Sequence, residues 1–352
     1  MGSSIVGALV AVVVVFFGSI AHADPTGSRG CGMDAPETPG VTATRTLDVG
    51  GITRSYNVHL PIGYDDAVPA ALVLNFHGYA GTSAGHEAAT GMSLHADEHG
   101  YIVVYPQASY FAAGQKPGYL FGQVASWNDL SCSGSPGPDG PTCSDSAFEY
   151  PVEQSCAADP DKDACNWCHC SVDDIAFVSA MLDDLESNLC VDTKSVFATG
   201  FSNGAMLTHR LGCAIPSRFA AIAPVSGTLM IGYNCAPPSG LKLSLMQIHG
   251  VHDRTIPIDG RSSSDGYFYT AVDEVVDRWA ADDSQDCESE DTPYPTSADG
   301  VRMLSCSERA DCSSGAEVVH CSWNERHTWP ATQNGTPFGN DIIWEFFEAN
   351  SR

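Results

Sequence analysis

The chain has 352 residues, of which 43% are hydrophobic, 9% aromatic and 17% charged, and this composition excludes a disordered or fibrous protein. The length suits one large globular domain with a sizeable core, or two small ones. Asp and Glu number 43 against 16 Lys and Arg, and the resulting formal charge of −27 would repel nucleic acid, anionic membrane surfaces and acidic polysaccharides, so neutral partners are favoured.

The first residues are expected to be a signal peptide and not part of the fold. Ile5–Ile20 is an almost unbroken apolar run, and Ala21-His22-Ala23 has the small-x-small pattern that signal peptidase cleaves. An uncleaved anchor is the alternative, but the run is short for a bilayer span and no other stretch could cross. We therefore expect residues 1–23 to be removed, leaving a secreted mature chain of residues 24–352, extracellular or periplasmic and without a membrane anchor.

Apolar runs that are typical of buried parallel strands recur along the chain. They are Ala71–Phe76, Tyr101–Pro106, Ser195–Gly200, Phe219–Gly227 and Leu243–Gly250, with a last strand expected in Gly315–Trp323. Helical periodicity appears in Ser171–Cys190, Tyr269–Asp283 and Gly339–Ser351. At the start of the first of these helices, Ser171 and Asp174 would form a capping box. Strands that alternate with helices predict an α/β fold with a mostly parallel central sheet.

One segment departs from this alternation. Ser131–Cys170 is rich in Gly, Pro, Asp and Cys, so we expect a disulfide-stapled, Cys-rich insertion over the sheet edge. All fourteen cysteines follow residue 23 and their number is even, as disulfides in an oxidising compartment would require.

Two metal-binding alternatives fall in the same segment. Cys165, Cys168 and Cys170, with His169 among them, could hold zinc, but an oxidising compartment favours disulfides. Asp159–Asp163 resembles the start of a calcium loop, yet the expected glycine is Ala164 and the closing glutamate is replaced. We therefore predict no metal site.

The strongest motif is "GFSNG", Gly200–Gly204, a G-x-S-x-G sequence between a predicted strand and a predicted helix. In that context the motif indicates a nucleophile elbow, a sharp turn that exposes the serine hydroxyl at the carboxyl end of the sheet. Small neighbours prevent collisions with adjacent strands. Ser202 is the expected nucleophile, and the backbone N–H of Asn203 would begin the following helix.

A serine is a poor nucleophile unless a histidine removes its proton and an acid orients that histidine. In such folds the chain order is Ser, Asp, His. Asp253 lies on a loop just past the strand that ends in "IHG", and His327 lies on the loop after the last strand. His320 is the competing base, but it lies inside the strand pattern, so we prefer His327.

An oxyanion hole requires hydrogen-bond donors directed at the developing negative charge. In "LNFHGYAGTSAG" a strand ends at Phe76 and a Gly-rich turn follows, which would let the backbone N–H of Tyr79 point inward. Together with the N–H of Asn203, this gives two donors. The alternative is an ordinary loop with a structural His77.

The set of motifs resembles the secreted poly(3-hydroxybutyrate) depolymerase and feruloyl esterase family, of which acetylxylan esterases are close relatives. The segments that carry it are "FHGYAGT", "SWN", "VDDIAFV", "GFSNGAM", "HGVHDRTIP" and "HTWP", in this order along the chain. The resemblance implies an α/β-hydrolase fold, in which Ser202 is the nucleophile, Asp253 the acid and His327 the base. It also implies that Tyr79 and Asn203 supply the oxyanion donors.

The sequence therefore predicts a secreted serine esterase that needs no metal or organic cofactor. The expected substrate is a neutral polysaccharide-linked ester carrying feruloyl or acetyl groups, or a polyester, with aryl esters slightly favoured. Tyr79, Trp127 and Trp329 are candidates for the walls of a substrate cleft, although aromatic residues near loops are often packing residues. The alternatives are a catalytically silent secreted binding module with the same fold, and a serine peptidase, since the same triad cleaves amides.

Overall fold

The computed structural model describes residues 25–112, 123–129, 136–137, 140–141, 172–229, 235–261, 263–264, 269–288, 291–332 and 334–352. The expected signal peptide lies outside these residues, as does nearly all of the expected Cys-rich insertion. The residues of the zinc and calcium alternatives also lie outside the described part of the chain.

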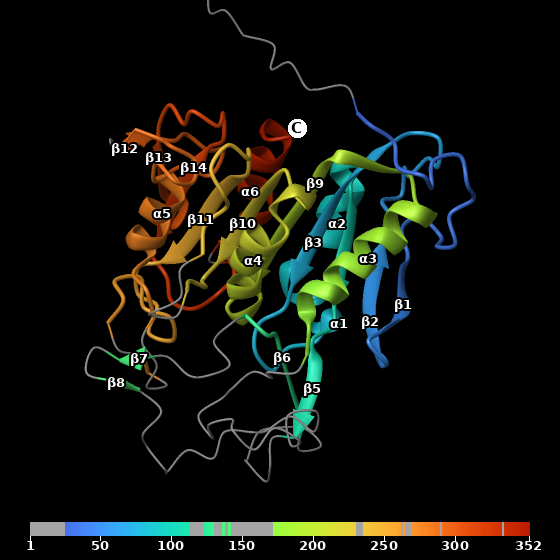
Figure 1. Cartoon of the computed structure of the whole chain (residues 1–352), viewed down its shortest axis with the longest axis horizontal. Helices are drawn as coiled ribbons and strands as arrows, with labels where there is room; N and C mark the ends of the chain where they lie inside the picture. Colours follow the sequence, from blue (N-terminus) through green and yellow to red (C-terminus); the bar gives the residue numbers. More distant parts are fainter. Residues whose placement is uncertain are drawn as a thin grey trace, which may run out of the picture.

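A ten-stranded sheet with the order β1-β2-β4-β3-β9-β10-β11-β14-β13-β12 forms the centre of the molecule (Figure 1). Its strands are β1 (Thr42–Val49), β2 (Ile52–His59), β3 (Ala70–Phe76), β4 (Ile102–Pro106), β9 (Val191–Phe201), β10 (Ala221–Val225), β11 (Ser244–Gly250), β12 (Asp291–Pro293), β13 (Ser305–Arg309) and β14 (Val318–Trp323). Neighbours from β4 to β14 pair in parallel, whereas the strands at both edges pair antiparallel. The predicted mostly parallel sheet is thus confirmed.

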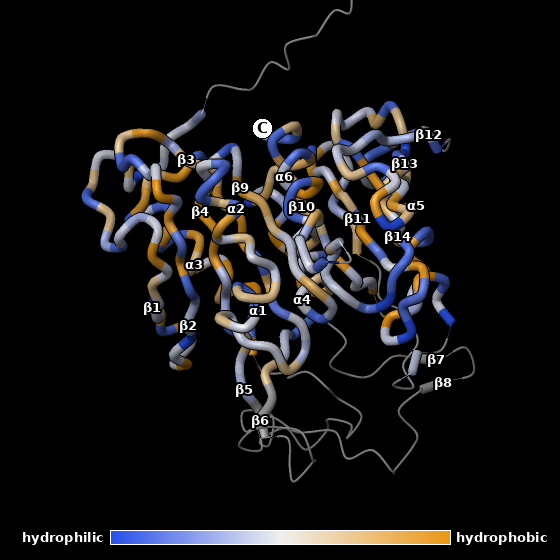
Figure 2. The backbone as a smooth tube through the Cα atoms, turned by 180° about the vertical axis from the view of Figure 1, so that it is seen from behind, coloured by the Kyte–Doolittle hydropathy of each residue, from blue (hydrophilic) through white to orange (hydrophobic). Residues whose placement is uncertain are grey.

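Helices cover both faces of this sheet. They are α1 (Ser83–Thr90), α2 (Met92–His99), α3 (Asp174–Asn188), α4 (Asn203–Ala214), α5 (Val272–Ala280) and α6 (Gly339–Ala349). Helices α3, α4 and α5 lie on one face and α1, α2 and α6 on the other (Figures 1 and 2). Each face has its own cluster of buried apolar side chains, which explains why the inner strands are hydrophobic on both sides. No helix of the described residues is both long and apolar enough to span a membrane.

Helix α3 does not begin with the predicted capping box. Ser171 lies outside the described residues, and the N-cap is Asp173, whose side chain accepts a hydrogen bond from the backbone N–H of Ala176. Asp174 is fully buried, and its carboxylate forms an ion pair with Arg54 at 2.7 Å. A carboxylate with a buried arginine partner is thus not available for capping.

The hairpin of β1 and β2 was not among the predicted strands. Its turn is Gly50-Gly51, and both residues have positive φ, 60° and 81°, as a two-residue hairpin turn of this type requires. Strand β1 is the sheet edge, where burial alternates along the strand, so its residues do not form an apolar run. The pair of glycines was the available sequence signal.

Four disulfides cross-link the described part of the chain. They link Cys31 to Cys190, Cys213 to Cys235, Cys287 to Cys312 and Cys306 to Cys321. The other six cysteines lie outside the described residues. In addition, β5 (Ser109–Ala112) and β6 (Gln123–Ser126) form a small hairpin at the lower end of the sheet in Figure 1, and β7 (Pro136–Gly137) pairs with β8 (Gly140–Pro141).

Candidate active site

The turn between β9 and α4 holds Ser202 in a strained conformation. Its φ is 57° and its ψ is −120°, a region that costs a non-glycine residue about 1–3 kcal/mol. Crowding explains the flanking glycines: a Cβ on Gly200 would lie 2.6 Å from the carbonyl oxygen of Gly204, and one on Gly204 would lie 2.3 Å from that of Phe76. The predicted elbow geometry is therefore present, and only glycine fits at either side.

Three loops at the carboxyl ends of β9, β11 and β14 bring Ser202, Asp253 and His327 together. The Oγ of Ser202 lies 2.9 Å from Nε2 of His327, and Nδ1 of His327 lies 2.6 Å from Oδ2 of Asp253. The other oxygen of Asp253 accepts hydrogen bonds from the backbone N–H groups of Thr255 (2.8 Å) and Ile256 (2.9 Å). This places a hydroxyl, an imidazole and a carboxylate in one continuous hydrogen-bonded chain.

The carboxylate of Asp253 is buried yet remains ionised. Burial alone would raise its pKa, but hydrogen bonds from His249 and His327 outweigh that effect and hold the pKa below the usual range. An acceptor-only carboxylate requires Nδ1 of His327 to carry the proton. The bare Nε2 can then accept the hydroxyl hydrogen of Ser202, which is the arrangement of a general base.

His320 lies elsewhere. It is part of β14, and its Nδ1 is 3.0 Å from Oδ1 of Asp273 on α5. Its ring therefore contacts helix α5 and not the loop that carries Ser202. The structure thus brings His327 to Ser202 and keeps His320 away from it.

The loop after β3 passes directly beside the serine. A Cβ on Gly78 would lie 3.2 Å from Cβ of Ser202, so the backbone at Gly78 lies close to the serine and a side chain there would press on its neighbours. The carbonyl of Gly78 accepts a hydrogen bond from the N–H of Gly81 at 3.0 Å, which closes a tight turn. The predicted oxyanion loop and the N-terminus of α4 therefore lie on either side of Ser202.

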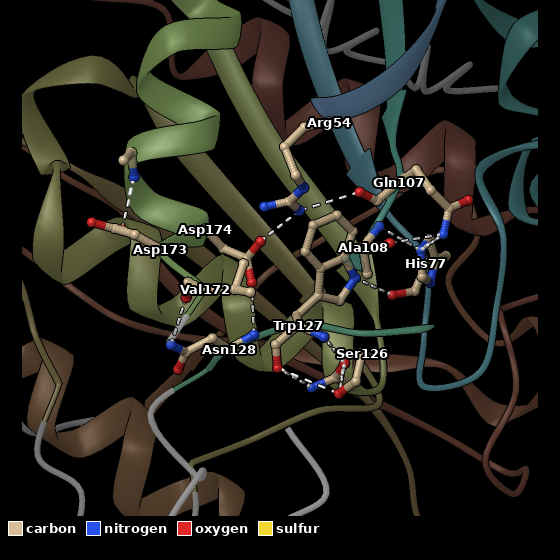
Figure 3. Close-up of polar contacts among 12 residues, drawn as sticks. Arg54, His77, Gln107, Ala108, Ser126, Trp127, Asn128, Val172, Asp173 and Asp174 are labelled. Atoms are coloured by element: carbon tan, nitrogen blue, oxygen red, sulfur yellow. Dashed lines mark hydrogen bonds and ion pairs between the residues drawn. The ribbon is translucent and has the colours of Figure 1, made fainter. Parts of the chain in front are cut away.

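His77 holds this loop in place through hydrogen bonds of its ring. Burial lowers the pKa of His77 to about 4, so the ring is neutral. Its Nε2 accepts the backbone N–H of Ala108 at 3.1 Å (Figure 3). Its Nδ1 lies 2.7 Å from the carbonyl oxygen of Gly78. With Nε2 as acceptor, Nδ1 is the donor, and the ring fixes the first residue of the turn.

Trp127 does not form the wall of an open cleft. Its side chain is fully buried and packs edge-on against Phe76, with ring centroids 5.3 Å apart. It donates its indole N–H to the carbonyl of His77 at 2.8 Å (Figure 3). The prediction of a substrate-binding role was wrong, because the indole fills the space beneath the oxyanion loop. The alternative, a packing residue, is the one the structure supports.

Trp329 is likewise a packing residue. It is 8% exposed, donates its indole N–H to Oδ1 of Asn340 at 3.2 Å and meets the His86 ring edge-on. Its predicted place in the substrate wall is therefore also wrong. Tyr79 differs from both tryptophans because it remains partly exposed beside Ser202.

A buried polar network behind the elbow was missed by sequence reasoning. The side chain of Asn203 accepts the backbone N–H of Trp127 at 2.8 Å and donates to Oδ2 of Asp129 at 2.8 Å. Asp174 accepts the backbone N–H of Asn128 at 2.8 Å (Figure 3). The segment 126–129 is thus fixed to both α4 and α3. The quoted "SWN" motif contained the signal, but its role depends on partners that are far away in the sequence.

Among the described residues, no group of three or more His, Cys, Asp or Glu side chains is arranged to hold a metal ion.

The sheet order, the strained serine and the helices on both faces define the molecule as an α/β-hydrolase. A family model described as Phospholipase/Carboxylesterase matches residues 172–289. The acetyl xylan esterase from Aspergillus awamori shares the fold, with a TM-score of 0.53 and 15% identity over 87% of this chain and 99% of that one.

Similarity in sequence points to esterases within this class. Feruloyl esterase C of Emericella nidulans is 27% identical over 183 residues, which are 52% of this chain and 60% of that protein. The putative esterase NocK of Nocardia uniformis is 27% identical over 313 residues, 84% of this chain and 76% of that protein. The chain spans about 60% of the length of the feruloyl esterase C relatives, and within the α/β-hydrolase fold it is similar in sequence to esterases.

Proposed function

We propose that the protein is a serine esterase that hydrolyses carboxylic esters with Ser202 as nucleophile, His327 as general base and Asp253 as the orienting acid. The observation that carries the proposal is the hydrogen-bonded chain from Ser202 through His327 to Asp253, which begins at a serine in a strained elbow. Strain at one residue and convergence of three loops on it are both typical of catalytic sites.

In the first half of the reaction, Nε2 of His327 takes the hydroxyl proton as Oγ of Ser202 attacks the ester carbonyl carbon. The tetrahedral intermediate collapses, the bond to the alcohol oxygen breaks, and His327 returns its proton to the leaving alcohol. Water then attacks the acyl-serine with the same proton transfers and releases the acid. Asp253 stays ionised throughout and stabilises the imidazolium that forms in each step.

The backbone N–H groups of Tyr79 and Asn203 are the proposed oxyanion donors. Asn203 is the first residue of α4, where N–H groups have no intrahelical partner and the helix dipole favours negative charge. Fixed donors of this kind need no reorganisation when charge develops on the carbonyl oxygen. The network around Asn203 and the His77 ring keep both donors in place.

For the substrate, we propose an ester attached to a polysaccharide, of the feruloyl or acetyl kind named for the similar proteins. The same chemistry would also cleave hydroxybutyrate polyesters. We further propose that the chain is exported, with residues 1–23 removed, since four disulfides suit an oxidising compartment.

Hydrolysis of a chromogenic short-chain ester and of methyl ferulate by the purified protein tests the proposal. We expect His327→Ala to lower kcat by about a thousandfold or more, as triad losses do. The matched control, His320→Ala, should retain most of the activity because His320 contacts Asp273 and not the serine. An inactive wild-type protein would favour a silent binding module, and an inactive His320→Ala with an active His327→Ala would overturn the assignment of the base.

A further inference from the structure

A small cleft opens beside the candidate triad on the same edge of the sheet. It has a volume of about 250 Å³ and is lined by Val251, His252, Asp253, Arg254, Arg261 and Arg326. A neighbouring hollow of about 510 Å³ shares His252 and Arg326 with it and adds Arg302. The smaller hollow is lined by Asp253 and by Arg326, the residue before His327, so it lies next to the candidate triad. The larger one combines the loops after β11 and β14 with Gly300, Arg302 and Met303.

The charge of this cleft is opposite to that of the molecule. The chain has only 16 Lys and Arg against 43 acidic residues, yet four of its arginines line the two hollows. Arg261 pairs with Asp259 at 2.7 Å, and Arg302 pairs with Glu325. Arg254 and Arg326 are exposed and have no ion-pair partner among the described residues. Two guanidinium groups without an ion-pair partner in the described part of the chain therefore lie at one place in an acidic protein.

A carboxylate is the ligand that such a cleft would recognise. A guanidinium binds a carboxylate through a planar fork of N–H donors, and charged hydrogen bonds are about twice as strong as neutral ones. Salt screens the repulsion from the overall charge of −27 beyond a distance of about 8–10 Å. A carboxylate that touches the cleft therefore interacts mainly with the nearby arginines. Among the described residues that line the cleft, the one carboxylate is that of Asp253, which is buried and hydrogen-bonded to His327.

We propose that this cleft binds a carboxylate group carried by the ester substrate, through Arg254 and Arg326. The inference rests on the proposed esterase function and narrows its substrate class from neutral esters to esters with an adjacent acidic group, such as a uronic acid residue near the ester on a polysaccharide. A strongly acidic enzyme could then bind a substrate with a single negative charge at these arginines, although its net charge would still repel a polyanion.

Matched pairs of esters that differ only in charge test the proposal. One pair is mono-4-nitrophenyl glutarate and 4-nitrophenyl glutaramate, with the charge on the acyl side. The other is 4-acetoxybenzoate and 4-acetoxybenzamide, with the charge on the leaving group. The readout is the ratio of kcat/KM for the charged ester to that for its neutral amide. We expect the double variant Arg254→Gln, Arg326→Gln to lower this ratio about tenfold in one pair, the size of one charged hydrogen bond.

Arg29→Gln is the control, because Arg29 is exposed and lies near the start of β9, at the opposite end of the sheet. It removes one positive charge far from the cleft and should leave the ratio as in the wild type. An equal ratio in wild type and double variant for both pairs would overturn the carboxylate site while leaving the esterase intact. Failure of the wild type to hydrolyse the neutral esters would instead overturn the esterase itself.

A second, independent observation concerns a buried chain of side chains behind Asp253. Nε2 of His249 lies 3.5 Å from Oδ2 of Asp253 and 2.8 Å from the carbonyl oxygen of Ile256. Nε2 of Gln247 lies 3.4 Å from Nδ1 of His249 and 3.0 Å from the carbonyl oxygen of Gly227. Both side chains are fully buried in β11, and the triad mechanism above does not use either of them.

The hydrogen-bond direction in this chain is determined by its partners. The carbonyl of Gly227 can only accept, so the group of Gln247 that faces it is the NH₂. That NH₂ also faces Nδ1 of His249, which must therefore be the bare acceptor, and Nε2 of His249 must carry the proton. The single proton on Nε2 of His249 is therefore donated to the carbonyl of Ile256 at 2.8 Å, while Oδ2 of Asp253 lies 3.5 Å from the same nitrogen. Because Ile256 also donates its backbone N–H to Oδ1 of Asp253, this bond holds the loop that carries the candidate triad acid.

We infer that His249 is a positioning residue that fixes the carboxylate of Asp253 for His327. Without this donor, the loop from Asp253 to Ile256 would lose the hydrogen bond that holds it against His249 of β11, and the carboxylate of Asp253 would be less well placed for Nδ1 of His327. His249→Leu should therefore lower kcat more than it changes KM.

His249→Gln keeps a terminal N–H donor and should restore kcat toward the wild-type value. Thermal unfolding of both variants separates this role from packing. Equal loss of kcat in the Leu and Gln variants, or a His249→Leu variant in which KM changes as much as kcat, would overturn the positioning role.

Discussion

Ser202 has a backbone conformation that glycine adopts more easily than any other residue. Its φ of 57° persists because the N–H of Ser202 donates to the carbonyl of Val225 at 3.0 Å, and α4 begins at the next residue. The surrounding strands therefore fix the backbone conformation of the turn. Keeping a serine in this conformation lowers the stability of the folded protein.

That cost can be measured by comparing two inactive variants. Ser202→Gly should be more stable than Ser202→Ala by about 1 kcal/mol, because glycine relieves a strain of about 1–3 kcal/mol and loses somewhat more chain entropy on folding. Urea denaturation of the two variants gives the difference. A less stable glycine variant would show that the elbow is not strained.

The ionised Asp253 should make stability depend on pH in the acid range. Its pKa in the folded protein lies below the usual value, so its contribution to stability is present above the unfolded-state pKa of about 4 and is lost as the pH falls toward the folded-state value. The difference in unfolding free energy between wild type and Asp253→Asn should therefore shrink below about pH 4. A difference that is constant from pH 7 to pH 3 would contradict the lowered pKa.

Trp127 belongs to the core and not to a substrate wall, so its removal should act first on stability. Trp127→Ala should lower the unfolding free energy by about 3–5 kcal/mol, as expected for a fully buried tryptophan, with a further loss from the unpaired carbonyl of His77. Chemical denaturation measures it, and a variant of wild-type stability with altered KM alone would restore the substrate-wall interpretation.

At the scale of elements, the inner strands were predictable because burial on both faces produces continuous apolar runs. The order of the triad residues followed from the elbow, since the loops after later strands meet at the same edge. The edge hairpin β1–β2 lacked such a run, and the start of α3 was misread because the partner of Asp174 is Arg54, far away in the sequence. Burial of Trp127 and Trp329 could not be read locally either, because it depends on the packing of distant elements.

The disulfides are expected to contribute unequally. Cys31 and Cys190 are 159 residues apart, whereas Cys306 and Cys321 are 15 apart and join the neighbouring strands β13 and β14. In the chain-entropy model a closed loop of this larger size stabilises by about 5 kcal/mol and one of the smaller size by about 3 kcal/mol.

Paired Cys→Ser variants of each bridge, compared by urea denaturation, test this ranking. Loss of the Cys31–Cys190 bridge should be the more destabilising. Equal losses would indicate that native-state packing, and not loop closure, determines the contribution.

At the scale of the whole molecule, charge and architecture act over different ranges. The net charge of −27 repels polyanions at long range. The apolar clusters on the two faces of the sheet fix the positions of the ends of β9, β11 and β14 relative to one another. A site assembled from β9, β11 and β14 therefore depends on the fold as a unit, although each side chain belongs to a short motif. The arginines near His327 reverse the sign of the charge only locally.

Covalent labelling tests most directly whether this architecture activates one serine. The protein is incubated with a fluorophosphonate, and the adduct is located by intact-mass measurement and peptide mapping. We predict one adduct per chain, on Ser202, and a strongly reduced labelling rate in His327→Ala but not in His320→Ala. An adduct on another residue, or labelling of Ser202 that is independent of His327, would contradict the assignment of the nucleophile and its base.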